Sequence, residues 1–585
     1  MTSPFLRNTS RLLLACSFFA ASCPTFGASP LPVAAENGMV VTAQHLATRV
    51  GVDILKKGGN AIDAAVAVGY ALAVVYPAAG NLGGGGFMTL QLADGRKTFL
   101  DFREKAPLAA TPSMYLDANG NVIKNLSTHG YLAAGVPGTV AGLELARLRY
   151  GTLPRHQLIA PAIALAKKGF VLDAGDVDML HQATDRLQKD APSAAIFLRH
   201  GQPLTVGERL VQKDLAHSLR LISRGGSKAF YNGPISRAIV AASQQGHGIL
   251  SAADFANYQA RELAPIECDY RGYHIVSAPP PSSGGVVICE ILNILEGYPL
   301  KELGYFSAQA VHYQIEAMRH AYADRNNYLG DPSFVSNPVT QLLDKAYAAN
   351  IRTAIHPEKA GVSLEIKPGV SPHDISAEGT NTTHYSIVDH AGNAVSVTYT
   401  LNGWFGAGVT AAGTGILLNN EMDDFTVKPG TPNLFGLVQG SKNAIAPGKR
   451  PLSSMSPTIV SRDGKPVMII GTPGGSRIIT VVVHSIINVI DYGMTIQEAI
   501  DAPRFHQQWL PDVTEVETFA FSPDTRKLLI DRGHKLGNPQ PANHAAGILI
   551  GAPALDGKPR GDQGSKKRFY GAIDPRRNTG SAAGY

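Results

Sequence analysis

The spacing of apolar residues along this chain switches repeatedly between a helical and a strand period. Apolar residues recur every three or four positions in long segments, which predicts helices with buried faces. In shorter segments they alternate with polar residues, and Gly-containing turns join these segments into antiparallel hairpins. The predicted helices cover residues 45–57, 60–76, 307–328 and 478–493, with a mainly helical region at 135–262, and the predicted hairpins turn at residues 94–95, 391–393 and 463–464.

Hairpins occur in both halves of the chain, and their apolar runs are too long for a sheet with one face in water. We therefore predict an α+β fold in which two stacked sheets are covered by helices. The 61 glycines and 38 prolines stand between periodic segments, so they indicate tight turns rather than disorder.

Charge and composition argue against nucleic acid as a partner. Hydrophobic residues make up 44% of the chain and charged residues 17%, as in a globular protein with a large core. The formal net charge of +6 is mild and dispersed. The basic cluster at residues 564–569 is predicted to be a solvated loop.

The N-terminus has the pattern of an export signal. Arg7 and Arg11 precede the apolar run Leu12–Ala21, whose ten residues are half of what a helix needs to cross a bilayer. We predict a signal peptide at residues 1–27, with cleavage after Gly27 or Ala35, and a periplasmic or secreted protein without a membrane span. Lipid attachment at Cys23 is the alternative.

Two cysteines, Cys268 and Cys289, lie in the body of the chain. An exported protein can form a disulfide between them. The apolar surroundings of Cys289 in "GGVVICEIL" favour a buried small side chain instead, so the pairing stays open.

Thr382 and Thr383 stand where a polar segment meets a strand pattern. Residues 357–381 are rich in Pro, Gly and Ser without apolar period, which predicts an exposed loop. A threonine hydroxyl is a weak nucleophile that needs a base beside it. The residue's own α-amine, with a reference pKa of about 7.7–8.0, is the most compact base, but it is free only after the preceding peptide bond is cut. Threonine pairs also favour strands for structural reasons alone.

The segment "GTPGGSR" supplies a second element of such chemistry. Gly474 and Gly475 lie at a predicted strand end, where amides without side chains can approach a substrate carbonyl and stabilise an oxyanion. The segment lacks the Gly-Lys-Ser/Thr ending of a phosphate-binding loop.

Long motifs decide between the chemical and the structural interpretation of Thr382. They are "AGNLGGGGFM", "LDFREKAP", "APPPSSGG", "TTHYSIVDHAGNAVSVTYTLNGWFG", "LLNNEMDDF", "KRPLSSMSPTIV", "GTPGGSRII" and "APRFHQQWLPD". With these motifs the chain closely resembles the gamma-glutamyltranspeptidases, N-terminal-nucleophile enzymes that cleave their own precursor, over nearly all of its length after the signal. The resemblance implies a four-layer αββα sandwich of the N-terminal-nucleophile hydrolase type.

The resemblance also implies a role for each candidate residue. Thr382 would be the nucleophile in both autocleavage and catalysis, Thr400 would hydrogen-bond it, and Gly474 and Gly475 would form the oxyanion hole. The remaining residues would hold the donor's charged head: Arg103, Ser453 and Ser454 its α-carboxylate, and Asn402, Glu421 and Asp424 its α-ammonium.

Cleavage between Asn381 and Thr382 would leave a large chain, 28–381, and a small chain, 382–585, which stay together as a heterodimer in one αββα domain. The implied substrates are glutathione and other γ-glutamyl compounds, with water, amino acids or peptides as acceptors, and no cofactor is implied.

Two positions bear on the expected substrate. The lid loop that follows "DDF" in the family often carries a tyrosine that pairs with the asparagine of "TLN", whereas Phe435 stands there in this chain. Glu421 is a glutamine in some relatives, and its charge favours a donor with an α-ammonium.

Two other patterns are given structural interpretations. The run Gly83–Gly86 follows a helix and opens a strand, which is the reverse of a dinucleotide site. His312, Glu316 and His320 share one helix face at spacings of four, and without a zinc motif we predict an ordinary polar face and no required metal.

Two alternative functions remain. A cephalosporin or glutaryl-amide acylase of the same fold would need no site for an α-ammonium, so Glu421 and Asp424 argue against it. A non-catalytic exported binder of γ-glutamyl peptides would have no reason to split into two chains.

Overall fold

The computed structural model describes residues 29–366, 382–538, 543–557 and 568–585. The predicted signal peptide, Asn381 and residues 564–567 of the basic cluster lie outside the described residues.

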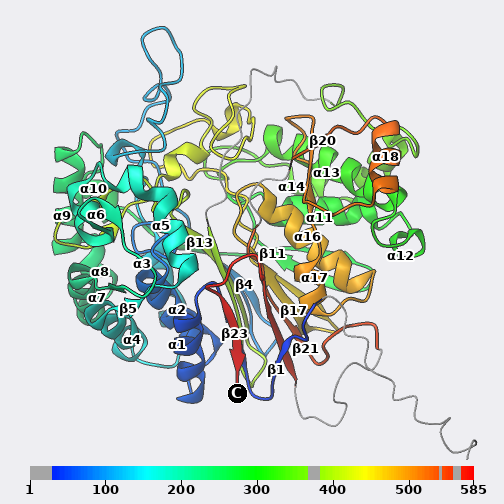
Figure 1. The fold of residues 1–585 in the computed structure, drawn as a ribbon. Helices are drawn as coiled ribbons and strands as arrows, with labels where there is room; N and C mark the ends of the chain where they lie inside the picture. Colours follow the sequence, from blue (N-terminus) through cyan, green and yellow to red (C-terminus); the bar gives the residue numbers. More distant parts are fainter. Residues whose placement is uncertain (1–28, 367–381, 539–542, 558–567) are drawn as a thin grey trace, which may run out of the picture.

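Two seven-stranded antiparallel sheets lie face to face at the centre of the molecule (Figure 1). The first consists, in spatial order, of β1 (Val33–Ala35), β22 (Phe569–Ile573), β21 (Ala546–Ile550), β17 (Lys465–Gly471), β16 (Thr458–Arg462), β11 (Tyr273–Ser277) and β10 (Ile266–Tyr270). The second consists of β23 (Ser581–Gly584), β2 (Met39–Thr42), β12 (Thr383–Val388), β13 (Ala394–Thr400), β3 (Gly85–Gln91), β4 (Lys97–Phe102) and β9 (Arg261–Leu263). Apolar side chains of both sheets, such as Val41 and Ile469, form a core between them.

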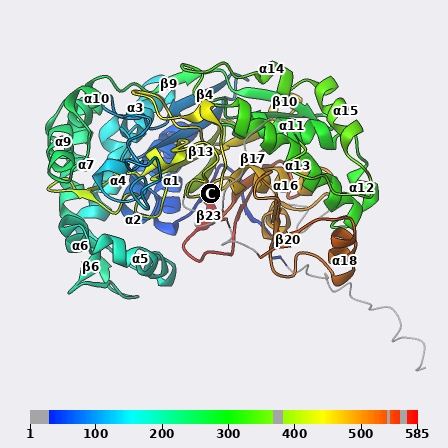
Figure 2. The ribbon, with the colours of Figure 1, turned by 90° about the horizontal axis from the view of Figure 1, so that it is seen from above.

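Helices cover the outer side of each sheet, so the four layers are αββα (Figure 2). On the side of the second sheet are α1 (His45–Lys56), α2 (Ala61–Val75), α3 (Thr139–Tyr150), α4 (Arg155–Lys168), α5 (Ala174–Leu187), α6 (Ala191–Phe197), α7 (Lys213–Gly225), α8 (Ser227–Tyr231), α9 (Pro234–Gln245) and α10 (Ala252–Ala256). On the side of the first sheet are α11 (Gly284–Leu295), α12 (Leu300–Leu303), α13 (Ala308–Tyr328), α14 (Val339–Leu342), α15 (Lys345–Ala354), α16 (Arg477–Ile490), α17 (Ile496–Asp501) and α18 (Pro523–Asp531).

Short strands complete the described fold: β5 (Phe170–Val171) with β8 (Arg209–Leu210), β6 (Leu198–Arg199) with β7 (Gln202–Pro203), β14 (Thr410–Ala411) with β15 (Ile416–Leu417), and β18 (Phe505–His506), β19 (Thr514–Val516) and β20 (Leu536–Gly537) together. The predicted α+β class, the stacked sheets and the four long helices are confirmed.

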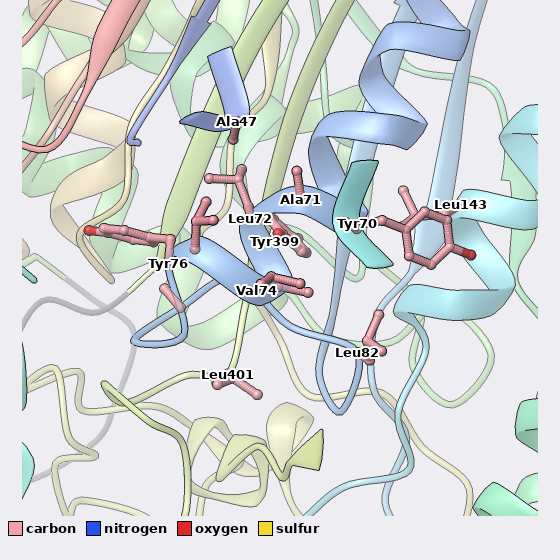
Figure 3. Packing of buried hydrophobic residues seen from close by; sticks show 14 of the residues in the cluster. Ala47, Tyr70, Ala71, Leu72, Val74, Tyr76, Leu82, Leu143, Tyr399 and Leu401 are labelled. Atoms are coloured by element: carbon pink, nitrogen blue, oxygen red, sulfur yellow. The ribbon is translucent and has the colours of Figure 1, made fainter. Parts of the chain in front are cut away.

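Helix α2 is buried along its whole length, as its unbroken apolar sequence requires. Figure 3 shows its side chains packed beside Tyr399 of β13 and Leu143 of α3. A capping box closes its N-terminus, because Asn60 accepts from the Asp63 amide while the Asp63 carboxylate accepts from the Asn60 amide. Among the described residues, no helix has the length and apolarity that spanning a bilayer requires.

The central hairpin of the second sheet determines where Thr382 lies. In the β12–β13 register Thr383 is opposite Tyr399, so the residue before β12 meets the end of β13. β12 also pairs with β2 on its other side, and β13 pairs with β3. The strands that follow Thr382 are therefore hydrogen-bonded on both sides to strands that precede it.

Two expectations about the chain need correction. Cys268 of β10 and Cys289 of α11 form a disulfide, because the helix packs directly on the strand, so Cys289 is not a free apolar side chain. The predicted exposed loop at 357–381 is not exposed throughout its described part. Ser363 is fully buried, where its hydroxyl donates to Asp512 and its carbonyl accepts from Trp509.

Candidate active site

Two threonine hydroxyls meet at the end of the central hairpin. Thr382 Oγ1 lies 3.4 Å from Thr400 Oγ1, and Thr382 is 5% exposed. The Asn402 amide donates to Thr400 Oγ1 at 2.7 Å, which fixes the orientation of that hydroxyl. Thr400 is thus held in place to contact the predicted nucleophile.

A small, partly open cavity extends from Thr382 and brings most of the predicted site together. It encloses about 20 Å³, which is room for only a water molecule or two. Nine of the ten predicted site residues line it: Arg103, Thr382, Thr400, Asn402, Glu421, Asp424, Ser453, Ser454 and Gly475. The tenth, Gly474, directly precedes Gly475 in the chain but does not line the cavity. Entry of a donor therefore requires some lining side chains to shift.

Arg103 is the centre of a buried cluster of charges. It follows β4, and its guanidinium is 2.7 Å from Glu421 Oε2, in contact with Asp424 Oδ2, and 3.5 Å from Glu104 Oε2. Burial lowers the pKa of Arg103, but these carboxylates raise it by more, so the group stays cationic. The residue predicted to bind the α-carboxylate is thus paired with the two acids predicted to bind the α-ammonium.

The carboxyls of this cluster resist ionisation. Burial raises the pKa of Glu104 to about 7, although Arg103 opposes that rise. Burial likewise raises the pKa of Glu421, and the neighbouring Glu104 and Asp424 charges raise it further. Apart from the ion pair with Arg103, no described residue donates a hydrogen bond to either carboxylate oxygen of Glu421. An incoming cation would relieve the crowding of negative charge.

A second guanidinium, from Arg325 of α13, also lines the cavity. It donates to Ser454 Oγ at 2.9 Å, to Ser283 Oγ at 3.0 Å and to Gln439 Oε1 at 3.2 Å. Burial lowers its pKa to about 10, which still leaves it charged at neutral pH. No carboxylate among the described residues lies within ion-pair distance of it. Arg325 therefore places a positive charge at the cavity, next to Ser454, and an anion bound there can neutralise that charge.

The two glycines of "GTPGGSR" have backbones that other residues avoid. Gly474 has φ +135° and Gly475 φ +56°. A Cβ on Gly474 would come 2.1 Å from Asn543 Oδ1, and one on Gly475 would come 2.2 Å from Phe435 Cδ1. Neither amide donates to another described residue. Both positions thus require glycine, and Gly475 lines the same cavity as Thr382.

The lid segment, residues 429–440, closes one side of the cavity. Phe435 and Leu437 line the cavity, and Phe435 is 5% exposed. Asn402, which a lid tyrosine would have contacted, donates to the Asn420 carbonyl instead. The lid packs on Gly475 through the ring of Phe435, as expected for a residue without a hydroxyl.

One cluster outside the cavity has side chains close enough to share a metal ion within the described part of the chain: His312, Glu316 and His534. His320 is not part of it. His312 Nδ1 is 2.8 Å from His534 Nε2, and Glu316 pairs with Arg319 at 3.3 Å. The helix face is polar, as predicted, but buried, and protein partners satisfy most of its groups.

Comparison with known proteins identifies the family. The model of the family described as Gamma-glutamyltranspeptidase matches residues 47–584. The chain belongs to the gamma-glutamyltranspeptidase family. A glutathione hydrolase proenzyme of Pseudomonas sp. (strain A14) is 69% identical over 577 residues, which cover 98% of this chain and 99% of that protein. A glutathione hydrolase proenzyme of Escherichia coli (strain K12) is 49% identical over 595 residues and 99% of both chains.

A solved structure agrees with the fold of this chain. A cephalosporin acylase from Bacillus halodurans superposes with a TM-score of 0.81 at 29% identity, over 97% of this chain and 99% of that one. Membership confirms the predicted resemblance, the αββα fold class and the prediction that the chain is an enzyme of this family.

Sequence reasoning missed several residues of the cavity. Glu104 lies inside the quoted motif "LDFREKAP" but was given no role. Arg325 follows Ala317 and Ala321 at spacings of four, and a charge on that small-residue face is the signal that could have revealed it. Leu452, Met455 and Ile478 supply apolar lining.

Proposed function

We propose that this member of the gamma-glutamyltranspeptidase family is an autoprocessed glutathione hydrolase. It would take the γ-glutamyl group from glutathione and related amides onto Thr382 and pass it to water or to amino acid and peptide acceptors. The observation that carries the proposal is the position of the Thr382 hydroxyl, beside Thr400 at the end of a cavity lined by both carboxylates and guanidiniums. The names of the two curated relatives support it.

Autoprocessing would occur between Asn381 and Thr382. The Thr382 hydroxyl adds to the Asn381 carbonyl carbon, the C–N bond breaks, and the nitrogen takes up the proton that the hydroxyl has lost, which makes it the new α-amine. Water then hydrolyses the resulting ester, which gives a carboxylate on Asn381 and restores the Thr382 hydroxyl. Thr382 lies in the cavity, where its hydroxyl is beside that of Thr400.

In catalysis the freed α-amine would accept the proton of the Thr382 hydroxyl as it attacks the γ-carbonyl. Thr400 would hold the nucleophile by its hydroxyl. The free amides of Gly474 and Gly475 would donate to the oxyanion. The same amine would then protonate the leaving nitrogen, and water or an acceptor amine would attack the ester in the reverse sequence.

The charges of the cavity support a zwitterionic head group on the donor. Glu421 and Asp424, with Glu104 behind them, crowd negative charge around Arg103, and an α-ammonium would offset it. Ser453, Ser454 and the guanidiniums of Arg103 and Arg325 would hold the α-carboxylate. A glutaryl group lacks the α-ammonium, so it would leave the negative charges of Glu421 and Asp424 without this additional cation.

The two chains would remain associated after the cut as a heterodimer. β12 and β13 of the small chain are hydrogen-bonded between β2 and β3 of the large one. Separation would expose the edges of these strands, those of the β1–β22, β11–β16 and β2–β23 pairs, and the core around them, so association is strongly favoured.

We also propose export to the periplasm or the medium. The disulfide between Cys268 and Cys289 supports it, because disulfides persist in oxidising compartments. The mass of the mature N-terminus would test it, and would also show whether Cys23 carries lipid.

A comparison of two substrates with one leaving group tests the function. A γ-glutamyl anilide should be cleaved with a kcat/KM on the order of a hundredfold above that of the glutaryl anilide, because the latter leaves buried acids without a partner. Glu421→Gln should lower the ratio of the kcat/KM for the γ-glutamyl anilide to that for the glutaryl anilide. A preference for the glutaryl anilide would indicate a glutaryl-amide acylase. Cleavage of neither anilide would indicate a non-catalytic binder of γ-glutamyl peptides.

A further inference from the structure

The lid segment places the ring of Phe435 over the turn at Gly474 and Gly475, the proposed oxyanion hole, which we call the oxyanion turn. Hydrogen bonds within the lid segment do not explain what holds the ring there. Within the segment, Asn433 Oδ1 accepts from the amides of Phe435 and Leu437 at 3.0 and 3.1 Å. These bonds shape the loop tip. They do not connect the tip to Gly475, which the ring covers.

Gln508, from the loop after β18, makes that connection. Its Nε2 donates to the Gly436 carbonyl at 3.1 Å and lies 3.4 Å from the carbonyls of Phe435 and Leu510. Its Oε1 accepts from Ser476 Oγ at 2.6 Å. Ser476 directly follows Gly475 in the chain, so one buried side chain bridges the lid and the oxyanion turn.

The orientation of the Gln508 amide is fixed by its neighbours. Besides the Ser476 hydroxyl, His506 Nε2 lies 2.9 Å from Oε1, and His506 Nδ1 lies 3.0 Å from the Thr480 hydroxyl. Burial lowers the pKa of His506 to about 3, so its ring is neutral and can carry its hydrogen on Nε2. Donors thus surround one end of the amide and carbonyls the other, which leaves a single satisfactory arrangement.

We propose that Gln508 is a positioning residue that holds Phe435 over the oxyanion turn and thereby limits the access of water to the acyl-enzyme. The inference rests on the proposed function for its kinetic consequence, but not for the structural link itself. An apolar ring over the turn shields the ester from water. An acceptor amine needs an ordered surface over the same ester, which the held lid provides.

Gln508→Met removes the donor and the acceptor while keeping the length of the side chain. Gln507→Met is the matched control, because Gln507 is also buried and its amide has no partner among the described residues. Hydrogen exchange on the whole protein should show the amides of Leu434, Phe435 and Leu437 exchanging about tenfold faster in Gln508→Met. The same amides should not change in Gln507→Met.

The kinetic test uses a γ-glutamyl anilide with a fixed concentration of a dipeptide acceptor. Gln508→Met should raise the ratio of hydrolysis to transfer several-fold, and Gln507→Met should not. In a Phe435→Ala background Gln508→Met should have no further effect, because Gln508 acts through the ring. A purely stabilising role would give the same change in both backgrounds.

Unchanged lid exchange in Gln508→Met would overturn the proposal whatever the substrate. A change in the ratio of hydrolysis to transfer that Gln508→Met still causes in the Phe435→Ala background would also overturn it. Failure of the proposed function has a different signature, which is absence of γ-glutamyl anilide cleavage by the wild-type protein, and in that case the exchange result alone decides the role of Gln508.

Discussion

Arg103→Met offers the most informative perturbation of the charge cluster. The substitution leaves Glu421, Asp424 and Glu104 buried without their cation. Removing one partner of a buried ion pair costs about 3–5 kcal/mol. The rise in the pKa of Glu104 from 4.5 to about 7 in the intact cluster corresponds to about 3 kcal/mol, so even with Arg103 present the ionised carboxyl is costly.

The cost should depend on pH in a defined direction. A carboxyl whose pKa is higher in the folded chain holds its proton more tightly when folded, so its contribution to stability falls as pH rises from about 4.5 through the folded pKa. Loss of Arg103 raises the pKa of Glu104 and Glu421 further, because Arg103 lowers both. The destabilisation by Arg103→Met should therefore be about 3–5 kcal/mol at pH 8 and shrink to about 1 kcal/mol at pH 5.

Urea unfolding followed by tryptophan fluorescence measures this difference. Both proteins should carry Thr382→Ala, so that cleavage does not differ between them. Arg199→Met is the control, because the Arg199–Glu208 pair is largely exposed and its loss should cost no more than about 1 kcal/mol at either pH. Equal destabilisation by Arg103→Met at pH 5 and pH 8 would refute the reasoning.

Three further substitutions test other parts of the structure. Thr400→Val should lower kcat on the order of a hundredfold, because it removes the contact to the nucleophile and leaves the Asn402 amide unpaired, whereas Thr400→Ser should retain most activity in the same assay. Arg325→Met should raise the KM of a γ-glutamyl anilide about tenfold or more, but not that of a 4-aminobutyryl anilide, which lacks the α-carboxylate; equal losses on both substrates would contradict its proposed role. Cys268→Ser with Cys289→Ser should cost about 3 kcal/mol in urea unfolding, because the bridge closes a sequence separation of 21 residues, while kcat/KM should not change; unaltered unfolding would show that the bridge adds no stability.

The sequence predicts those parts of the fold that depend on neighbouring residues. The β12–β13 hairpin follows from alternation on both sides of the turn at Gly392, and α13 follows from its period and its cap at Ser307. The site residues came from motifs whose members lie close together in the chain, and the structure gathers nine of the ten around one cavity. Local spacing was sufficient for these elements, whereas the site residues came from the family resemblance that the motifs carry, and their roles remain predictions.

Features made by packing between distant segments were not predictable. Arg325 reaches the cavity from a helix that lies far from Thr382 in the sequence. The disulfide exists because α11 packs on β10, which no local pattern shows. The pairing of Arg103 with Glu421 and Asp424 unites three groups that had been assigned to different ends of the donor. In each case the partner is set by packing between segments that are distant in the chain, not by spacing along it.

Separation of the purified, active protein under denaturing conditions, with N-terminal sequencing of the smaller chain, tests the central role of Thr382 most directly. We expect two chains, the smaller beginning Thr382-Thr383-His384, and a single inactive chain in Thr382→Ala. Full activity in an uncut polypeptide, or a small chain that begins at another residue, would contradict a mechanism in which the liberated α-amine of Thr382 serves as the base.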